Sequence, residues 1–345
     1  IDCTIRVCII ILINQISTSS IFKSNFPGLL ACITVGLAAG FLSDHYGGPT
    51  MLYALLLGIA FNFLHENPRT QPGIELSVKS ILRIGVALLG FRMSLEAVIA
   101  LGWPPVLLVV GSVIATIVFG AFCARFVQRD SQFGLLTGGA VAICGASAAL
   151  AISALSAKTP QHERDTLFTV IAVTAMSTIA MVVYPLIAAF LGLSDSHSGI
   201  FFGATIHDVA QVVGAGYSVS AESGDTATVI KLIRVAMLLP VVLLLSLLMR
   251  RQQSASGGTL TSLPIPWFVF AFALFVLINS SGWLPSAVTV FLVELSRLCI
   301  VTAVAGLGMK TSLGELVKIG PKPVLLVVAE TLFLAAVVSL ALQFI

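Results

Sequence analysis

A hydrophobic stretch in the second half of the chain carries polar side chains that could bind an ion or move a proton. Residues 203–216 read GATIHDVAQVVGAG, so Thr205, His207, Asp208 and Gln211 lie within two turns of any helix formed there. Inside a membrane, an ionisable group costs about 2.5–3.5 kcal/mol to insert, and such groups are usually functional or paired. These four residues are therefore candidates for a substrate site.

A second stretch is rich in small residues. Residues 137–147 read TGGAVAICGAS and end on Gly145, Ala146 and Ser147. Each glycine lowers helix stability by about 1 kcal/mol relative to alanine, so we expect the helix to break here. The first residues after a break would point N–H groups and a positive dipole at an anion. The alternative is that the small residues only allow two helices to pack closely.

Three cations have no acidic residue at helical spacing on their own segment: Arg83, Lys231 and Arg234. An excess of buried cations attracts an anion, and arginine can hold an oxyanion through two N–H groups at once. We therefore include all three in the predicted substrate site. Glu330 stands alone, and the sequence assigns it no role. Two other cations are expected in ion pairs within one helix, Glu75–Lys79 and Glu294–Arg297.

The motifs of common enzymes and metal sites are absent from the sequence. The six cysteines form no CxxC pair, and no group of histidines and cysteines has metal-ligand spacing. There is no HExxH, GxSxG, P-loop or GxGxxG motif, and no polar segment is long enough for a nucleotide-binding domain. We therefore expect no catalytic residues, no cofactor and no bound metal.

Membrane-spanning helices must position these residues. Of the 345 residues, 58% are apolar and only 10% are charged, against about 25% charged in soluble domains. A span needs about 20 apolar residues, and the chain divides into about eleven such stretches, which predicts an all-α polytopic membrane protein. Residues 1–26 are expected to form a peripheral or extra helix. The predicted spans are 27–43, 49–64, 72–94, 104–127, 133–156, 163–193, 196–220, 225–250, 264–282, 285–312 and 323–345.

The loop charges predict an orientation, because short cytoplasmic loops are enriched in lysine and arginine. With the N-terminus in the cytoplasm, nine loop cations fall inside and two, Lys158 and Arg164, fall outside. This bias, with an odd number of spans, predicts a cytoplasmic N-terminus and a periplasmic C-terminus. The nine inside cations are Arg6, Lys23, Arg69, Arg125, Arg129, Arg250, Arg251, Lys318 and Lys322.

The chain also contains an internal repeat. Residues 94–110 (SLEAVIALGWPPVLLVV) match residues 312–328 (SLGELVKIGPKPVLLVV) at a constant offset of 218. The match pairs spans two to four with spans nine to eleven, and a separation of seven spans gives the copies opposite orientations. Such inverted repeats are typical of secondary transporters. Within a transporter domain of residues 27–345, the repeat halves cover about 47–127 and 265–345, and the repeat does not account for the core segments 133–220.

Several runs carry a resemblance to a known family, and the most specific of them is IHDVAQV. The chain resembles the YeiH-type sulfate exporter family of bacterial inner-membrane proteins from about residue 27 to 340. That family is similar to bile-acid symporters and sodium/proton antiporters. The resemblance implies broken, crossing helices in a core domain that moves against a scaffold. The runs are 47–63, 72–95, 142–155, 203–216 and 231–246.

The resemblance points to the same candidate site residues as the spacing does, except Thr205. One departure is that span five carries no acidic residue, which makes cation antiport through paired carboxylates doubtful. The leading hypothesis is a secondary transporter that exports or exchanges a small inorganic or organosulfur anion such as sulfate, with His207 and Asp208 carrying a coupled proton. The alternatives are cation/proton antiport through Asp208 and a membrane sensor or structural protein without transport. The expected partners are the anion and the lipid bilayer, without nucleic acid, and a homodimer is one open assembly.

Overall fold

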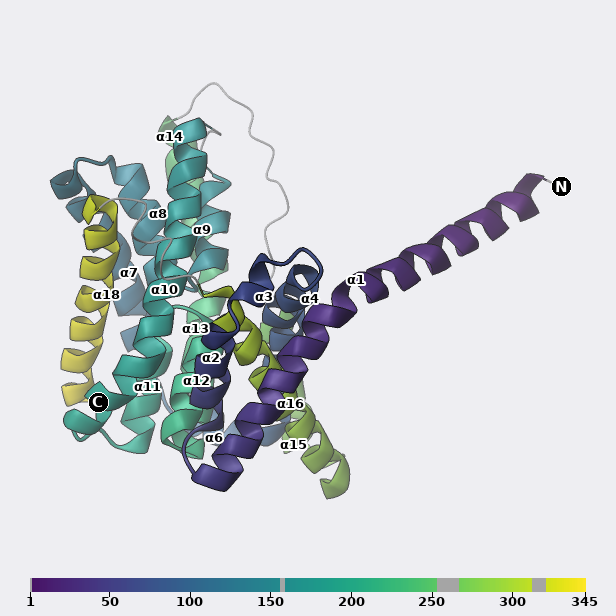
Figure 1. The fold of residues 1–345 in the computed structure, drawn as a ribbon. Helices are drawn as coiled ribbons and strands as arrows, with labels where there is room; N and C mark the ends of the chain where they lie inside the picture. The colour runs from purple at the N-terminus through teal and green to yellow at the C-terminus, as the bar shows by residue number, and fades with distance from the viewer. Residues whose placement is uncertain (1, 156–158, 253–266, 312–320) are drawn as a thin grey trace. The chain divides into compact units, whose positions relative to one another are not determined.

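The computed structural model describes residues 2–155, 159–252, 267–311 and 321–345 (Figure 1). Within these ranges every regular element is a helix, as the sequence predicts. Parts of three sequence predictions lie outside the described residues. They are the loop cations Lys158 and Lys318, the start of the predicted span 264–282, and residues 312–320 of the matched repeat segment 312–328.

Six helices in the described part of the chain are long and apolar enough to cross a membrane. Three shorter apolar helices accompany them, α2 (Thr50–Ala60), α12 (Val209–Val219) and α15 (Trp267–Ser280). The chain is therefore a helical membrane protein with several spans. The six long candidates are Ser24–Tyr46, Pro104–Val127, Pro160–Phe190, Ala221–Leu247, Ser286–Lys310 and Lys322–Phe344.

The chain forms two compact units. Unit 1 comprises residues 1–85 and 297–310, and unit 2 comprises residues 86–296 and 311–345. The boundaries between them fall inside two helices, α5 (Leu82–Leu88) and α16 (Ser286–Lys310).

Unit 1 is built on the long helix α1 (Asp2–Tyr46), which packs against α2 and α4 (Gln71–Leu76). Pro27 lies inside α1, so residues 2–26 continue into the first predicted span as one helix. The predicted pair of Lys79 and Glu75 is confirmed, with 2.7 Å between Lys79 Nζ and Glu75 Oε2. Its exposure limits its value to about 0–1 kcal/mol. Unit 1 also contains α3 (Phe63–Glu66) and a π-helical turn, Ser77–Ile81.

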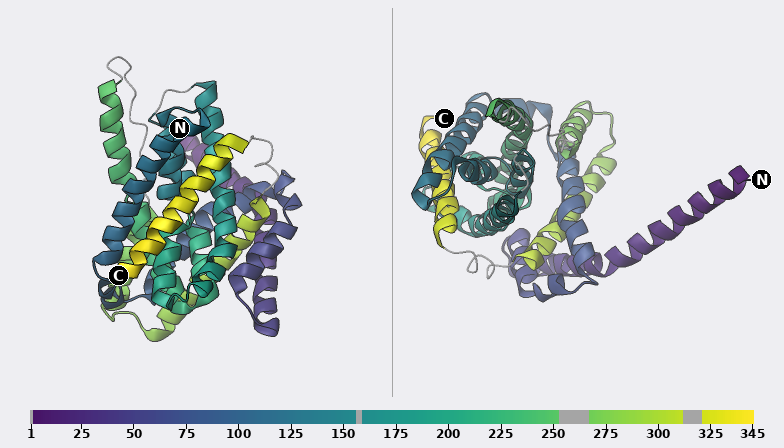
Figure 2. Two further views of the ribbon diagram at one scale, coloured as in Figure 1. Left: turned by 90° about the vertical axis from the view of Figure 1, so that its left-hand side faces the viewer. Right: turned by 90° about the horizontal axis from the view of Figure 1, so that it is seen from above.

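Unit 2 contains the helices that carry most of the predicted site. In Figures 1 and 2, α18 runs beside α7 and α10, and its contacts agree with those views. The long helices are α7 (Pro104–Cys123), α10 (Pro160–Phe190), α13 (Ala221–Ala236), α14 (Leu238–Gln252) and α18 (Pro321–Ala341). The shorter ones are η2 (Leu89–Arg92), α6 (Leu95–Ala100), η3 (Ala124–Val127), α8 (Ser131–Ala142), α9 (Ala146–Ser153), α11 (Asp195–Thr205), α12, α15 and η4 (Leu342–Phe344).

Helices α8 and α9 form a re-entrant hairpin along the first half of α10. Phe133, near the start of α8, stacks on Phe168 of α10 with ring centroids 6.0 Å apart. Ser153, at the end of α9, lies 2.7 Å from the Thr166 hydroxyl. The turn between the two arms lies against Val173, deeper along α10. Both arms therefore reach the same end of α10, and the chain returns to the end from which it entered.

Helices α11 and α12 form a second hairpin along the other half of α10. The ring of Phe201 on α11 lies 5.1 Å from that of Tyr184, and Gly214 on α12 lies against Met181. The turn between the arms hydrogen-bonds Ser177, near the middle of α10. In Figure 1, α8 and α9 lie together toward the top and α11 and α12 together at the bottom. The two hairpins thus enter from opposite ends of α10, and their turns meet at its middle.

These hairpins correct two of the predicted spans. The stretches 133–156 and 196–220 are long enough to cross a membrane, but each turns back at its centre. The crossing helices implied by the family resemblance are likewise replaced by hairpins whose turns touch. Apolar length alone cannot distinguish a crossing helix from a hairpin, because both bury the same number of apolar residues.

Two helix contacts occur at positions related by the 218-residue offset. In unit 2, a Cβ added at Gly90 would lie 3.1 Å from the Val276 nitrogen on α15. In unit 1, a Cβ added at Gly308 would lie 2.8 Å from the Cα of Gly58 on α2. Gly90 corresponds to Gly308 and Gly58 to Val276 under the offset of 218. A helix of each predicted repeat copy therefore packs closely against a segment of the other copy.

Candidate functional site

The turn of the first hairpin depends on one glycine. Helix α8 ends at Ala142, and Gly145 has φ +63° and ψ −122° before α9 begins at Ala146. A side chain at Gly145 would meet Val173 and His207 only at ordinary contact distances of 3.6 and 3.7 Å. The positive φ, rather than lack of space, therefore requires glycine here. The predicted break at this stretch is present in the structure.

The turn of the second hairpin uses extended residues instead. Helix α11 ends at Thr205, and Ile206 and Asp208 both have extended backbone before α12 begins. The Asp208 carboxylate accepts a hydrogen bond from the Ala210 N–H at 3.2 Å, which caps α12. Gly145 lies against His207, so the two turns are in direct contact.

Two buried cations on α13, Lys231 and Arg234, bind the carbonyl groups at the C-terminal ends of α8 and α11. These two helices are the arms that lead into the turns. Lys231 Nζ donates to Ile143 O at 2.8 Å and to Ile206 O at 2.9 Å. Both side chains, Lys231 and Arg234, are fully buried. Arg234 donates to the carbonyls of Val141 and Ala142 on the first hairpin, and of Gly203 and Ile206 on the second, at 2.8–3.1 Å.

This arrangement explains why α13 carries two cations at i and i+3. The last carbonyls of a helix have no partner within it and carry a partial negative charge. Lys231 and Arg234 satisfy these groups on α8 and α11 at once and hold the two turns together. Four of the five Arg234 N–H donors are used in this way. The cations therefore serve the helix ends, which differs from the direct grip on an anion suggested by the sequence.

Polar residues of α10 complete the second turn, and the sequence analysis did not include them. Ser177 Oγ accepts from the Asp208 N–H at 3.0 Å and donates to Gln211 Oε1 at 3.0 Å. Gln211 Nε2 donates to Thr178 Oγ1 at 3.1 Å. Gln211 is fully buried, so these bonds offset the cost of burying its amide. Its role in the structure is to position the turn.

His207 is fully buried and contacts α18. Its Nε2 lies 3.0 Å from Thr331 Oγ1, and the Thr331 hydroxyl donates to Val327 O at 2.8 Å. The tautomer of the His207 ring decides whether Nε2 donates to the Thr331 hydroxyl or accepts from it. The Thr205 hydroxyl, also buried, bonds back to Phe201 O in its own helix.

The side chains at the start of the returning arms are the accessible part of the site. Ser147 is exposed, and Ala146 and Asp208 are partly exposed, whereas the other residues of the two turns are buried. The first N–H groups of α9 and α12 have no partner within their helices, and each N-terminus carries about half a positive charge. With Lys231, Arg234, Asp208 and the two capped C-termini, the sum at the turns is about +1 by the same estimate.

Arg83 differs from the other predicted site residues. It lies in unit 1 with an exposed side chain, whereas the others all lie in unit 2. Within unit 2 the structure brings the residues at the start of α9 together with residues of the consecutive helices α11, α12 and α13. The signal that identified them was a polar or small residue inside an apolar stretch.

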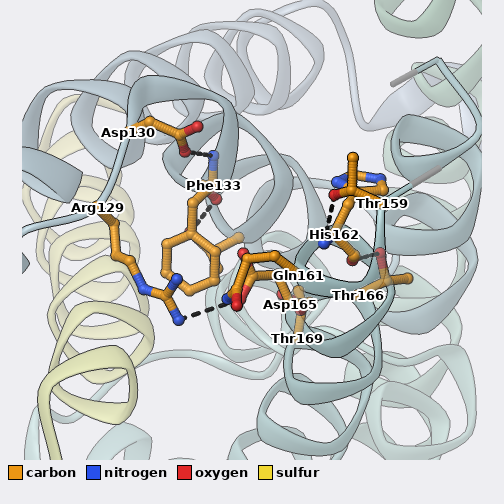
Figure 3. Close-up of polar contacts among 10 residues, drawn as sticks. Arg129, Asp130, Phe133, Thr159, Gln161, His162, Asp165, Thr166 and Thr169 are labelled. Atoms are coloured by element: carbon orange, nitrogen blue, oxygen red, sulfur yellow. Dashed lines mark hydrogen bonds and ion pairs between the residues drawn. The ribbon is translucent and has the colours of Figure 1, made fainter. Parts of the chain in front are cut away.

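A second polar cluster fixes the base of the first hairpin (Figure 3). Arg129 Nη2, just before α8, lies 3.1 Å from Asp165 Oδ1 on α10. His162 Nε2 lies 2.9 Å from Ser153 Oγ at the end of α9. Both arms of the hairpin are therefore tied to the first turns of α10.

The fold and these contacts define a class of protein, a polytopic α-helical membrane protein with two re-entrant hairpins that meet at buried cations. The chain belongs to the family whose model is described as Conserved hypothetical protein 698, which matches residues 27–327.

Several relatives are similar over nearly their whole length. A UPF0324 membrane protein of Chlorobaculum tepidum is 53% identical over 327 residues, which cover 94% of this chain and 91% of the relative. A UPF0324 membrane protein of Rhizobium meliloti is 52% identical over 321 residues, 92% of this chain and 93% of the relative. The UPF0324 membrane protein TauZ of Paracoccus pantotrophus is 48% identical over 333 residues, which cover 96% of this chain and 98% of the relative. No solved structure matches this chain.

Proposed function

We propose that the protein is a secondary transporter, not an enzyme, that exports or exchanges a small inorganic or organosulfur anion such as sulfate. The observation that carries the proposal is the meeting of the two hairpin turns. There the N-termini of α9 and α12 converge, and these helix ends favour an anion. Ser147 and the first N–H groups of α9 would contact the anion, and Lys231 and Arg234 would attract it without direct contact.

The buried cations also favour an anion over a cation as the transported ion. In transporters with interrupted helices, carbonyl groups at the breaks commonly coordinate a coupling cation. Here Lys231 Nζ already lies within 2.9 Å of two such carbonyls, those of Ile143 and Ile206. A sodium ion at this position would have to displace a buried ammonium group. Cation/proton antiport through Asp208 is therefore the less favoured alternative, ahead of a sensor without transport.

Two features support the predicted orientation and repeat. With the N-terminus inside, a hairpin of α8 and α9 that returns to its own side would put Arg164 on the cytoplasmic side with Arg129, which differs from the outside position predicted from the sequence. The proposed orientation, N-terminus inside and C-terminus outside, would then have a larger excess of basic residues on the cytoplasmic side. The two glycine contacts related by 218 residues support an inverted repeat in a bacterial inner-membrane transporter.

Sulfate flux into proteoliposomes tests the proposal. Ser147→Asp places a fixed negative charge at the start of α9, where aspartate does not weaken a helix, and we expect it to lower flux at least about tenfold. Ser147→Asn, with similar size and no charge, is the matched control and should keep flux within about threefold. Absence of flux for sulfate and methanesulfonate in the unmodified protein would reject the anion class.

A second measurement separates the cation alternative. Asp208→Asn keeps a side chain that caps a helix about as well as aspartate. If the protein transports an anion, this variant should retain sulfate flux. If it is a cation/proton antiporter, the unmodified protein should show a sodium-dependent or potassium-dependent proton flux that Asp208→Asn abolishes.

A further inference from the structure

Glu330 lies in the interior of unit 2, and none of the ion pairs among the described residues includes it. It is fully buried, near the middle of α18. Its Oε1 accepts a hydrogen bond from the Thr137 hydroxyl of α8 at 2.8 Å, and its Oε2 has no hydrogen-bond partner among the described residues. Glu330 lies eight residues, about 12 Å, along the helix from Lys322 at the end of α18.

The surrounding helices make room for this carboxyl group. A Cβ at Gly120 of α7 would lie 2.5 Å from Glu330 Oε1 and 2.7 Å from the Gly134 carbonyl oxygen of α8, so glycine is needed there for the close approach of α7 to both α8 and the carboxyl group. The next residue, Thr331, holds His207 in the second turn. Glu330 and Thr331 therefore join α18 to the arm of one hairpin and the turn of the other.

The hydrogen bonds around Glu330 suit a protonated acid. An ionised carboxylate with one neutral donor and no counter-ion is very costly to bury. If Glu330 is protonated, it donates to Thr137 Oγ1, and the Thr137 hydroxyl donates to Phe133 O at 3.2 Å. Every proton in this chain then has an acceptor, and the remaining Glu330 oxygen is a neutral carbonyl.

The other titratable groups near α18 do not supply a counter-ion to Glu330 in the described part of the chain. Asp165 pairs with Arg129, His162 bonds Ser153, and Lys322 bonds Gln128. The titratable groups of the elements packed against α18 are Cys123, Arg125, His162, Glu163, Arg164, Asp165, Tyr184, Asp195, His197 and, at the second turn, His207.

We propose that Glu330 binds the proton that crosses the membrane with the anion. The inference rests on the proposed anion transport. When the site at the turns is empty, its excess positive charge favours an ionised Glu330. When a substrate anion neutralises that charge, Glu330 takes up a proton. Anion and proton therefore bind together, and each raises the affinity for the other by the same factor.

Radiolabelled sulfate binding and flux, measured against pH with the purified full-length protein in proteoliposomes, test this coupling. With one proton taken up per anion, the apparent sulfate affinity of the unmodified protein should fall by up to about tenfold per pH unit above the transition. Glu330→Gln mimics the protonated acid and should bind sulfate with no dependence on pH across that range. Glu163→Gln, an exposed change on α10, is the control and should keep the pH dependence.

The outcomes separate this proposal from the transport proposal. A pH dependence that is equal in Glu330→Gln and the unmodified protein would overturn the role of Glu330 and leave anion transport intact, and so would sulfate binding that does not vary with pH. Absence of sulfate binding and flux in the unmodified protein would reject both.

Infrared difference spectra between acid and alkaline pH give an independent reading. A carboxylic acid band that titrates in the unmodified protein should be missing in Glu330→Gln. Identical spectra for the two proteins would overturn the proposal even if the variant misfolds in part, because the band reports the carboxyl group itself.

Discussion

Each of the two hairpins of unit 2 contains a tight turn, and the two turns are stabilised by different groups. The first turn is made by the backbone, with a glycine at positive φ and small residues on both sides. The second is made by side chains, in which Ser177, Thr178 and Gln211 fix the turn from one side and Thr331 fixes it from the other. The only exposed side chain of the first turn is Ser147, at the start of the returning arm. We infer that the first turn is the adaptable one and the second the rigid one.

Arg234 contacts both hairpins, so we expect its substitution to lower the stability of the protein most. Arg234→Met has similar length and removes the side-chain donor to the carbonyl groups of Val141, Ala142 and Gly203, whereas Ile206 O keeps its bond from Lys231. Each buried carbonyl left without a partner costs about 1–3 kcal/mol, so we expect a loss of several kcal/mol and little folded protein after mild heating. Fluorescence-detected size-exclusion chromatography after heating measures this loss.

Arg234→Lys is the matched variant, since it keeps the charge and loses the forked geometry. We expect the unfolding temperature of Arg234→Lys to lie between those of Arg234→Met and the unmodified protein. An unfolding temperature of Arg234→Met equal to that of the unmodified protein would mean that the cation does not hold the turns.

The first hairpin alone should respond to Gly145→Ala. Alanine at φ +63° and ψ −122° costs about 1–3 kcal/mol of strain. Hydrogen–deuterium exchange should increase in α8 and α9 and remain unchanged in α11 and α12. Gly111→Ala is the control, because Gly111 is helical with open space beside it, and there alanine should be neutral or slightly stabilising. Equal exchange changes in both hairpins would contradict a role of Gly145 in the first turn alone.

The second hairpin should respond, more weakly, to Gln211→Met. The change keeps the side-chain volume but leaves Ser177 and Thr178 each without one partner, at a cost of about 1–2 kcal/mol. The same exchange experiment should now show faster exchange in α11 and α12 and no change in α8 and α9. Gln132→Met, at an exposed position of α8, should have no measurable effect on either hairpin. Faster exchange in α8 and α9 alone would contradict the role of Gln211 in stabilising the second hairpin.

Much of the membrane architecture was readable from the sequence. Apolar stretches located the helices to within a few residues, since the predicted 104–127 corresponds to α7 and η3, Pro104–Val127. Small residues before Ser147 located the first break, and the polar group around His207 located the second. These signals are local, because burial in lipid and glycine in a helix act on each segment by itself.

The tertiary structure shows that two predicted spans turn back at their centres instead of crossing the membrane. Nothing in the stretches 133–156 and 196–220 distinguishes a crossing helix from a hairpin. The contacts that decide it are made by α10, through Phe168 and Thr166 for one hairpin and Tyr184 and Met181 for the other.

The sequence by itself determined that this is a helical membrane protein and that polar residues such as His207, Lys231 and Arg234 lie inside it, because the cost of burying polar groups depends on residue type. Only the tertiary structure decided what those residues do. Lys231 and Arg234 looked like unpaired cations, and their partners are carbonyl groups of the two turns. The residues around Glu330 in the sequence indicate no role for it, whereas the structure places Thr137 and Gly120 beside its carboxyl group. Backbone carbonyls belong to every residue, so their lack of a partner at a broken helix end appears only once the chain is folded.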